Sequence, residues 1–270
     1  MMQFKSNYLA RFLGGCLLAG FCLAIALSGS WTPVNSQVEG YQTTISQIET
    51  KQTQTSQTKT SQTQNAQPKT YQTTKAFTQY RPNYKVILAH DTNYGDRYAR
   101  DVRGNPLANQ PIAVLHETVG SASSALNLFR RANYRDSDQA SYHTLITLDG
   151  TVIYIVPPEK RAFGAGNSAF RSATGTEAVQ TNPNLAPSVN NFAYHVSLET
   201  PPDGRNNQRS HSGYTPAQYK SLAWLLAQSS IPDERITTHK EVDLSGTRLD
   251  PRSFDLPRLL NILHAYRQPT

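Results

Sequence analysis

The sequence predicts one α/β domain in which helices flank a mixed central β-sheet. From about residue 110 onward, short runs rich in β-branched and aromatic residues alternate with segments of helical periodicity, and this order is typical of a sheet covered by helices. Two of the strand-like runs are joined by Asp149-Gly150, a dipeptide that favours a tight hairpin turn, so the sheet should contain an antiparallel pair. The segment 81–270 is long enough for one domain with a sizeable core.

Five segments are predicted as strands and three as helices. The strand segments are 112–116, 142–148, 151–156, 194–199 and 235–239. A first helix is expected over 121–133, where apolar residues recur at helical spacing. A second should open at Thr215-Pro216, which supplies an N-cap and a proline at the first helical position, and a third should cover about 256–266.

Residues 1–30 have the pattern of a secretory signal peptide. Two basic residues are followed by an uncharged apolar run, 12–27, and then by small residues. This run of sixteen residues is shorter than the roughly 20 that a membrane span needs, so cleavage is expected. An uncleaved N-terminal anchor is the alternative, and Cys16 in a loose lipobox makes a lipoprotein the third possibility. The protein should therefore be exported to the periplasm, cell envelope or medium, with membrane contact only through an uncleaved leader.

Residues 31–80 are predicted to be a disordered linker rich in Gln, Thr and Ser. Between positions 36 and 75 there are ten Gln, eleven Thr and four Ser, with very few large apolar side chains. Such a segment cannot bury enough apolar surface to offset the entropy lost on ordering. The folded domain is accordingly assigned to residues 81–270.

Charge and cysteine content exclude several classes of function. The net charge is +7, but residues 1–81 carry +5 of it and residues 82–270 only +2. Because the folded part also lacks an interleaved basic and aromatic stripe, nucleic-acid binding is not expected. Both cysteines, Cys16 and Cys22, lie in the leader. The mature chain would therefore contain no thiol, which excludes cysteine peptidases and thiol redox enzymes.

The spacing of three polar residues indicates a metal site. His239 ends a predicted strand, and Asp250 follows eleven residues later, just before a proline. A catalytic zinc needs three protein ligands and one open position, so a third ligand must come from elsewhere. His116 ends an apolar run, on the side of Ile112 and Val114 by strand periodicity, where open sheets tend to build sites.

The other histidines are weaker candidates. His195 alternates with Ser197 and Glu199 on its strand and could neighbour a site, although a structural role is favoured. The remaining candidates lie where solvent or a core edge explains them: His90, His211 and His264.

The sequence resembles the type 2 N-acetylmuramoyl-L-alanine amidases, a family that includes phage lysozyme amidases and peptidoglycan recognition proteins. The resemblance covers about residues 110–265 and rests on seven short segments in the expected order: Val114-Leu115-His116-Glu117-Thr118, 141–146, 149–152, Ala165-Gly166-Asn167-Ser168, 196–199, 215–218 and Thr238-His239-Lys240-Glu241-Val242. It implies the fold described above and a zinc hydrolase that acts on peptidoglycan or muropeptides. The protein is expected to be a monomer. The bond cleaved would be the amide between N-acetylmuramic acid and L-alanine.

The resemblance also implies a role for each site residue. The zinc ligands would be His116, His239 and Asp250. Glu199 matches the catalytic glutamate, which would act as general base and acid. Arg248 stands where many members have lysine and would hold the oxyanion.

Tyr142 and Asn167 are the expected substrate contacts. Tyr142 matches a tyrosine that some relatives use near the metal, but strand alternation places it with Thr144 and Ile146, so a core aromatic is the equal alternative. Asn167 belongs to a matching motif, although Phe163-Gly164-Ala165-Gly166 stands where many members have Trp-His-Ala-Gly.

Two other readings of the same fold remain open. One is a peptidoglycan-binding recognition module without hydrolysis, and the other is a hydrolase that acts on a different amide. Competent residue types at all three ligand positions and at Glu199 favour the amidase.

Overall fold

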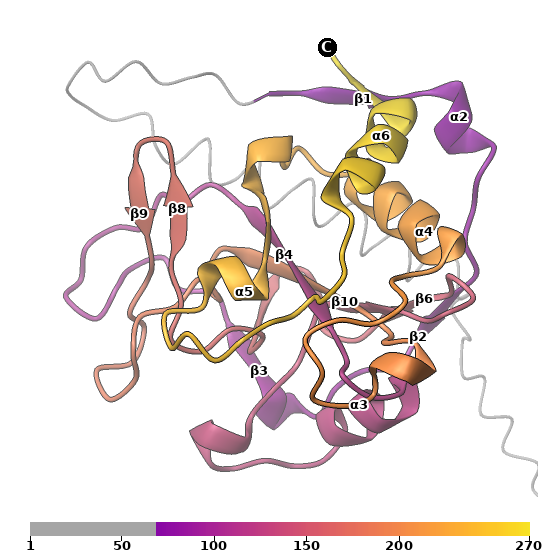
Figure 1. The fold of residues 1–270 in the computed structure, drawn as a ribbon. Coiled ribbons are helices and arrows are strands. Elements are labelled where there is room, and N and C mark those ends of the chain that lie inside the picture. Colours follow the sequence, from indigo (N-terminus) through magenta and orange to yellow (C-terminus); the bar gives the residue numbers. More distant parts are fainter. Residues whose placement is uncertain (1–68) are drawn as a thin grey trace, which may run out of the picture.

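A six-stranded mixed sheet forms the centre of the computed structural model, which describes residues 69–270 (Figure 1). The strand order is β11-β4-β10-β5-β6-β2. The strands are β2 (Tyr84–Val86), β4 (Ile112–Glu117), β5 (Thr144–Ile146), β6 (Val152–Tyr154), β10 (Ala193–Leu198) and β11 (Ile236–Thr238). Neighbours pair in parallel except β5 and β6, which are antiparallel. The predicted mixed sheet is confirmed.

The hairpin between β5 and β6 turns where the sequence predicts it. Gly150 has a φ of +85°, and its N–H donates to the carbonyl of Thr147 at 2.8 Å. A Cβ atom at this position would lie 2.9 Å from the carbonyl oxygen of Ala217, so both the backbone angle and the space require glycine. Because the turn uses residues 147–151, both strands are shorter at this end than predicted, and each also loses two predicted residues at its other end.

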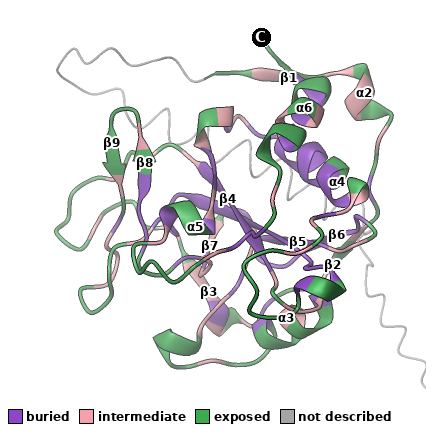
Figure 2. Cartoon of the chain, in the orientation of Figure 1, coloured by how far each residue is buried: buried purple, intermediate pink, exposed green. Residues whose placement is uncertain are grey.

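The helices α4 (Pro216–Leu226) and α6 (Leu256–Tyr266) cover one face of the sheet (Figure 1). Ala113 and Leu115 of β4 pack into this larger core. The predicted start of α4 is confirmed, since Thr215 caps the helix through a reciprocal capping box with Gln218. Figure 2 shows the central strands buried, with exposed residues on the outer sides of the helices.

The opposite face is covered by α3 (Ala122–Phe129) and by the loops that follow β6. The alternate residues of β4, Ile112 and Val114, pack on this side. Since side chains alternate along a strand, His116 also lies on this face. His116, the candidate ligand on β4, therefore lies on the side away from α4 and α6.

The alternation argument for Tyr142 was wrong. Tyr142 packs in the cluster under α3 with Leu145, whereas Ile146 lies in the opposite core. The physical reason is a bend at His143, whose carbonyl accepts hydrogen bonds from the N–H groups of both Ile155 and Val156. This interruption of the ladder moves Tyr142 to the face that carries His116.

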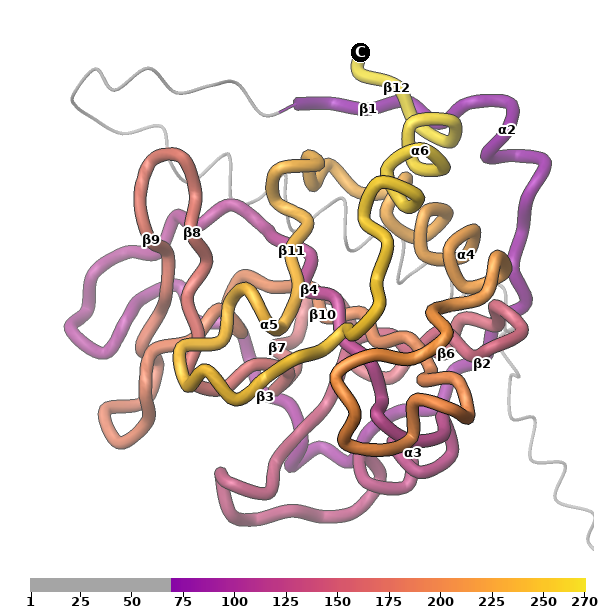
Figure 3. The backbone as a smooth tube through the Cα atoms, viewed as in Figure 1, coloured from indigo at the N-terminus to yellow at the C-terminus, as the bar shows by residue number. Residues whose placement is uncertain are grey.

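Packed structure begins before the predicted boundary at Arg81. Residues 69–80, expected to belong to the linker, form β1 (Tyr71–Thr73) and α2 (Lys75–Thr78). β1 pairs with the last strand, β12 (Arg267–Pro269), as Figure 3 shows. The Phe77 ring stacks on Trp224 at 5.7 Å between ring centroids. The predicted signal peptide and residues 31–68 of the predicted linker lie outside the described residues.

The remaining elements are short and lie around the sheet. They are β3 (Tyr94–Asp96), β7 (Lys160–Ala162), β8 (Phe170–Ser172), β9 (Gly175–Glu177), α5 (His239–Val242) and four 3-10 turns, Asp91–Asn93, Asp136–Asp138, Pro202–Gly204 and Asp233–Arg235. Within residues 69–270, no helix is long and apolar enough to cross a membrane.

Candidate metal centre

Two parallel strands bring His116 and His239 to the same edge of the sheet. Thr238, the last residue of β11, pairs with Leu115 of β4. The residue that follows each of them is a histidine, His239 after Thr238 and His116 after Leu115. The two imidazole rings lie 4.6 Å apart between centroids. His239 is the first residue of α5 and not the last of a strand, because Thr238 caps a helix there together with Glu241.

Asp250 completes a group of three convergent ligand atoms. Its Oδ2 atom lies 3.0 Å from Nδ1 of His239 and 3.4 Å from Nδ1 of His116. The carbonyl of Asp250 accepts a hydrogen bond from the N–H of Lys240 at 2.9 Å, which fixes the returning loop against α5. The three candidate ligand atoms all lie within 4.8 Å of one another. The structure thus brings together the three residues that the sequence singled out.

The chemistry of these residues fits a zinc ion. Burial lowers the pKa of His116 to about 4, and this outweighs the effect of Asp250, so the imidazole is neutral near pH 7. Burial opposes ionisation of Asp250, but the close approach of His116 and the hydrogen bond with His239 hold its pKa below the ordinary value. Nδ1 of His116 is buried without a hydrogen-bond partner among the residues that the structure describes. Imidazole nitrogens and a carboxylate oxygen are ordinary zinc ligands.

Glu199 lies on the same face of the sheet as His116. Ser197 of β10 pairs with His116, and Glu199 is two residues further along. Oε1 of Glu199 accepts hydrogen bonds from the N–H of Ala122, at 2.9 Å, and from Nη2 of Arg205, at 3.2 Å. Oε2 accepts one from the N–H of Leu148 at 3.1 Å. These donors fix the orientation of the carboxylate.

A pocket of about 330 Å³ adjoins this carboxylate. Glu199 forms part of its wall, and the hairpin residues and Lys85 form the rest.

The other three predicted site residues differ in how closely they approach the histidines. The half-buried ring of Tyr142 stacks on His116 at 4.4 Å between centroids. Arg248 and Asn167 are exposed. Arg248 is close enough that its positive charge contributes to the low pKa of His116, although less than burial and the neighbouring His239 do. The Asn167 carbonyl accepts a hydrogen bond from Leu244 at 3.1 Å, which places it beside the loop that carries Arg248.

Comparison with known sequences decides the family. The sequence model of a family described as N-acetylmuramoyl-L-alanine amidase matches residues 108–253, more than half of the chain. The chain belongs to this amidase family. The matched segment contains all three candidate ligands. None of the curated proteins matches the chain.

Several solved structures are similar to this amidase-family chain. A selenomethionine derivative of AmpD has 21% sequence identity and a TM-score of 0.46, and the match covers 68% of this chain and 96% of that one. The endolysin amidase LysCS from Clostridium intestinale has 17% identity and a TM-score of 0.42, with 68% and 97% covered. AmpDh3 from Pseudomonas aeruginosa, in complex with an anhydromuramic pentapeptide, has 18% identity and a TM-score of 0.37, with 60% and 58% covered. The family assignment rests on the sequence model and not on these structures.

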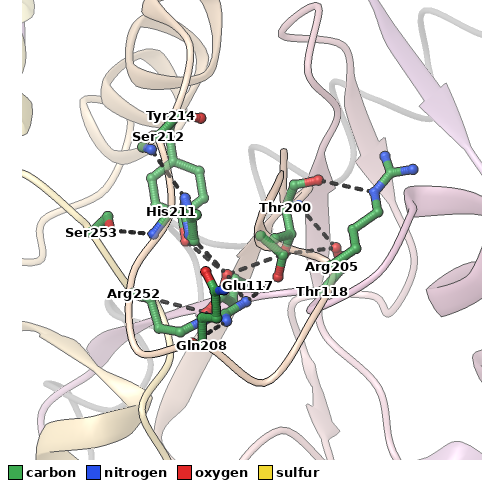
Figure 4. Close-up of polar contacts among 12 residues, drawn as sticks. Glu117, Thr118, Thr200, Arg205, Gln208, His211, Ser212, Tyr214, Arg252 and Ser253 are labelled. Atoms are coloured by element: carbon green, nitrogen blue, oxygen red, sulfur yellow. Dashed lines mark hydrogen bonds and ion pairs between the residues drawn. The ribbon is translucent and has the colours of Figure 1, made fainter. Parts of the chain in front are cut away.

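A buried polar network beside the ligands was not found by sequence reasoning. Glu117 of the amidase domain, next to His116, has a fully buried side chain and accepts hydrogen bonds from Nε of Arg252 at 2.6 Å and from Nη2 at 3.3 Å (Figure 4). It also accepts from Thr200 at 3.1 Å. Arg252 follows Asp250 by two residues, so this ion pair attaches the loop of one candidate ligand to the strand of another.

The same network includes His211, which agrees with the core-edge alternative for this histidine. Its side chain is fully buried and donates from Nε2 to Glu117 at 3.2 Å, and Tyr214 donates to the same carboxylate at 3.4 Å (Figure 4). The sequence offered one signal for this network, a glutamate directly after a strand-ending histidine. The partners of Glu117 are distant in sequence, so no local pattern could identify them.

Proposed function

We propose that this chain is an exported zinc-dependent N-acetylmuramoyl-L-alanine amidase that cleaves the amide between N-acetylmuramic acid and L-alanine in peptidoglycan or muropeptides. The observation that carries the proposal is the convergence of His116, His239 and Asp250 in a chain of this family. The uncharged apolar run of the leader supports export.

The three convergent residues would hold the metal through Nδ1 of each histidine and the carboxylate of Asp250. A bound zinc would supply a Lewis acid for the scissile carbonyl and would lower the pKa of water to about 7. The packing of the chain excludes bulk water from one side of this centre, since His116 is fully buried beneath the Tyr142 ring.

Glu199 is the proposed general base and acid. Its Oε2 atom accepts one protein hydrogen bond and Oε1 accepts two, so Oε2 is the oxygen with more room to accept a hydrogen bond from the attacking water. In the proposed reaction, this carboxylate takes the proton of the attacking water and delivers it to the leaving amine of L-alanine.

Arg248, Asn167 and Tyr142 are proposed to act on the substrate. Arg248 would stabilise the negative charge that develops on the carbonyl oxygen, a role for a fixed cation. Asn167 lies beside the same loop, and its exposed side chain is available for polar contact with sugar or peptide. Tyr142 stacks on His116 and would line the floor of the site.

The test is hydrolysis of peptidoglycan by the purified full chain loaded with zinc. New amino termini on L-alanine are expected, and a chelator should abolish them while later addition of zinc restores them. Glu199→Gln is the matched variant, because it keeps the shape and hydrogen-bond acceptor but cannot act as a base. Binding to peptidoglycan without release of amino termini would instead support a recognition module. Release that persists in the chelator would contradict zinc dependence.

A further inference from the structure

His195 contacts a candidate metal ligand from the neighbouring strand. Its partner on β4 is Val114, and His116 is two residues further along, so both imidazoles lie on the same face of the sheet. Nδ1 of His195 lies 2.9 Å from Nε2 of His116, and both residues are fully buried. The two histidines therefore share a hydrogen bond that water does not reach.

The direction of this hydrogen bond follows from the other nitrogen of His116. Nδ1 of His116 faces Asp250 and has no hydrogen-bond partner in the described part of the chain. A neutral imidazole that offers the lone pair of Nδ1 to a metal must carry its hydrogen on Nε2. Nε2 of His116 then donates to Nδ1 of His195. His195 carries its own hydrogen on Nε2, a buried atom with no hydrogen-bond partner among residues 69–270.

Gly164 leaves the space that the His195 ring occupies. A Cβ atom at Gly164 would lie 2.5 Å from both Cγ and Nδ1 of His195, closer than non-bonded carbon atoms approach in proteins. No side chain at position 164 is compatible with this placement of the ring. Gly164 stands where the Trp-His-Ala-Gly motif has its histidine. In this chain the ring of His195, on β10, occupies the space beside that position.

A third histidine holds the backbone of His195. The N–H of His195 donates to Nδ1 of His143 at 2.9 Å, and the two rings are nearly parallel, with an interplanar angle of 5°. Nε2 of His143 lies 3.1 Å from the carbonyl of Lys160, to which it donates. Because His143 is itself fixed, the acceptor atom of His195 has a defined position relative to His116.

We propose that His195 is a positioning residue of the metal site: it accepts the Nε2 hydrogen of His116 and thereby directs Nδ1 of His116 towards His239 and Asp250. This inference rests on the metal site proposed above. Partners of this kind fix the tautomer and orientation of a ligand histidine, and their removal typically costs about 10- to 100-fold in metal affinity.

The experiment measures the zinc dissociation constant of the full chain by competition with a chromogenic chelator. His195→Leu removes the acceptor at similar volume and should weaken zinc binding about 10- to 100-fold. His195→Asn places its Oδ1 atom close to the position of Nδ1 and should recover most of the affinity. Gly164→Ala should weaken binding in the same direction, because the added methyl group displaces the ring.

Leu259→Ala is the control for loss of stability without loss of the hydrogen bond. Leu259 is buried in α6 on the other face of the sheet, so this variant should unfold more easily but bind zinc as the wild type does. Unchanged zinc affinity in His195→Leu would overturn the inference, as would equal weakening in His195→Leu and His195→Asn. Failure of the proposed function has a different outcome. The zinc affinities of the wild type and the variants then follow the expected order, but the wild type does not cleave peptidoglycan. A wild-type chain that binds no zinc overturns both.

Discussion

Arg252→Ala should destabilise the domain strongly because it leaves a charge buried without its partner. The Glu117 side chain is fully buried and would lose the two charged hydrogen bonds from Arg252, at 2.6 and 3.3 Å. Each charge-assisted hydrogen bond contributes about 1.5–3 kcal/mol, and breaking a buried ion pair from one side costs about 3–5 kcal/mol. We therefore expect the free energy of unfolding to fall by about 3–5 kcal/mol.

Urea denaturation followed by circular dichroism measures this loss. The control is Arg135→Ala, which removes an exposed ion pair with Asp138, at 2.9 Å, and should change the free energy by less than about 0.5 kcal/mol. The double variant Glu117→Gln, Arg252→Met should be more stable than Arg252→Ala, because no unpaired charge remains buried. If Arg252→Ala cost no more than Arg135→Ala, the account of this network would be refuted.

Three further outcomes are expected. Burial lowers the pKa of His116 to about 4 and those of His143 and His195 well below 6.5, so below pH 6.5 the unfolded chain binds more protons than the folded one. The free energy of unfolding of the metal-free protein should consequently fall from pH 6.5 towards pH 4, by up to about 1.4 kcal/mol per pH unit for each histidine. A free energy from urea denaturation that does not change with pH over this range would contradict this. Phe77→Ala removes the stack on Trp224 and should cost about 1–3 kcal/mol with a change in tryptophan fluorescence, whereas a linker residue would leave both unchanged. Glu199→Gln should lower kcat for muropeptide cleavage at least about 100-fold while zinc content stays at the wild-type level, and a smaller loss would argue against its role as base.

The alternating pattern of β4 was sufficient to predict which face carries His116. Ile112, Val114 and His116 share one side of the strand, as period-two alternation requires. The hairpin at Gly150 was predictable for a similar reason, because a local turn sequence specifies it. Regular local geometry therefore predicted much of the central sheet.

Features that depend on tertiary contacts could not be predicted in this way. The bend at His143 reverses the alternation that Tyr142 was expected to follow. The Glu117 network joins residues up to 135 positions apart, and no local pattern reports such a pairing. The segment 69–80 has a polar composition, but a few aromatic side chains such as Phe77 attach it to α4 and α6.

The most direct test of the account is anomalous diffraction at the zinc absorption edge from crystals of the full chain grown with zinc. We expect one strong peak bounded by His116, His239 and Asp250, the residues whose ligand atoms lie within 4.8 Å of one another. The peak should be absent from crystals of His116→Ala. A wild-type crystal with no peak at these residues, or a His116→Ala crystal with an undiminished peak, would contradict the proposed metal centre.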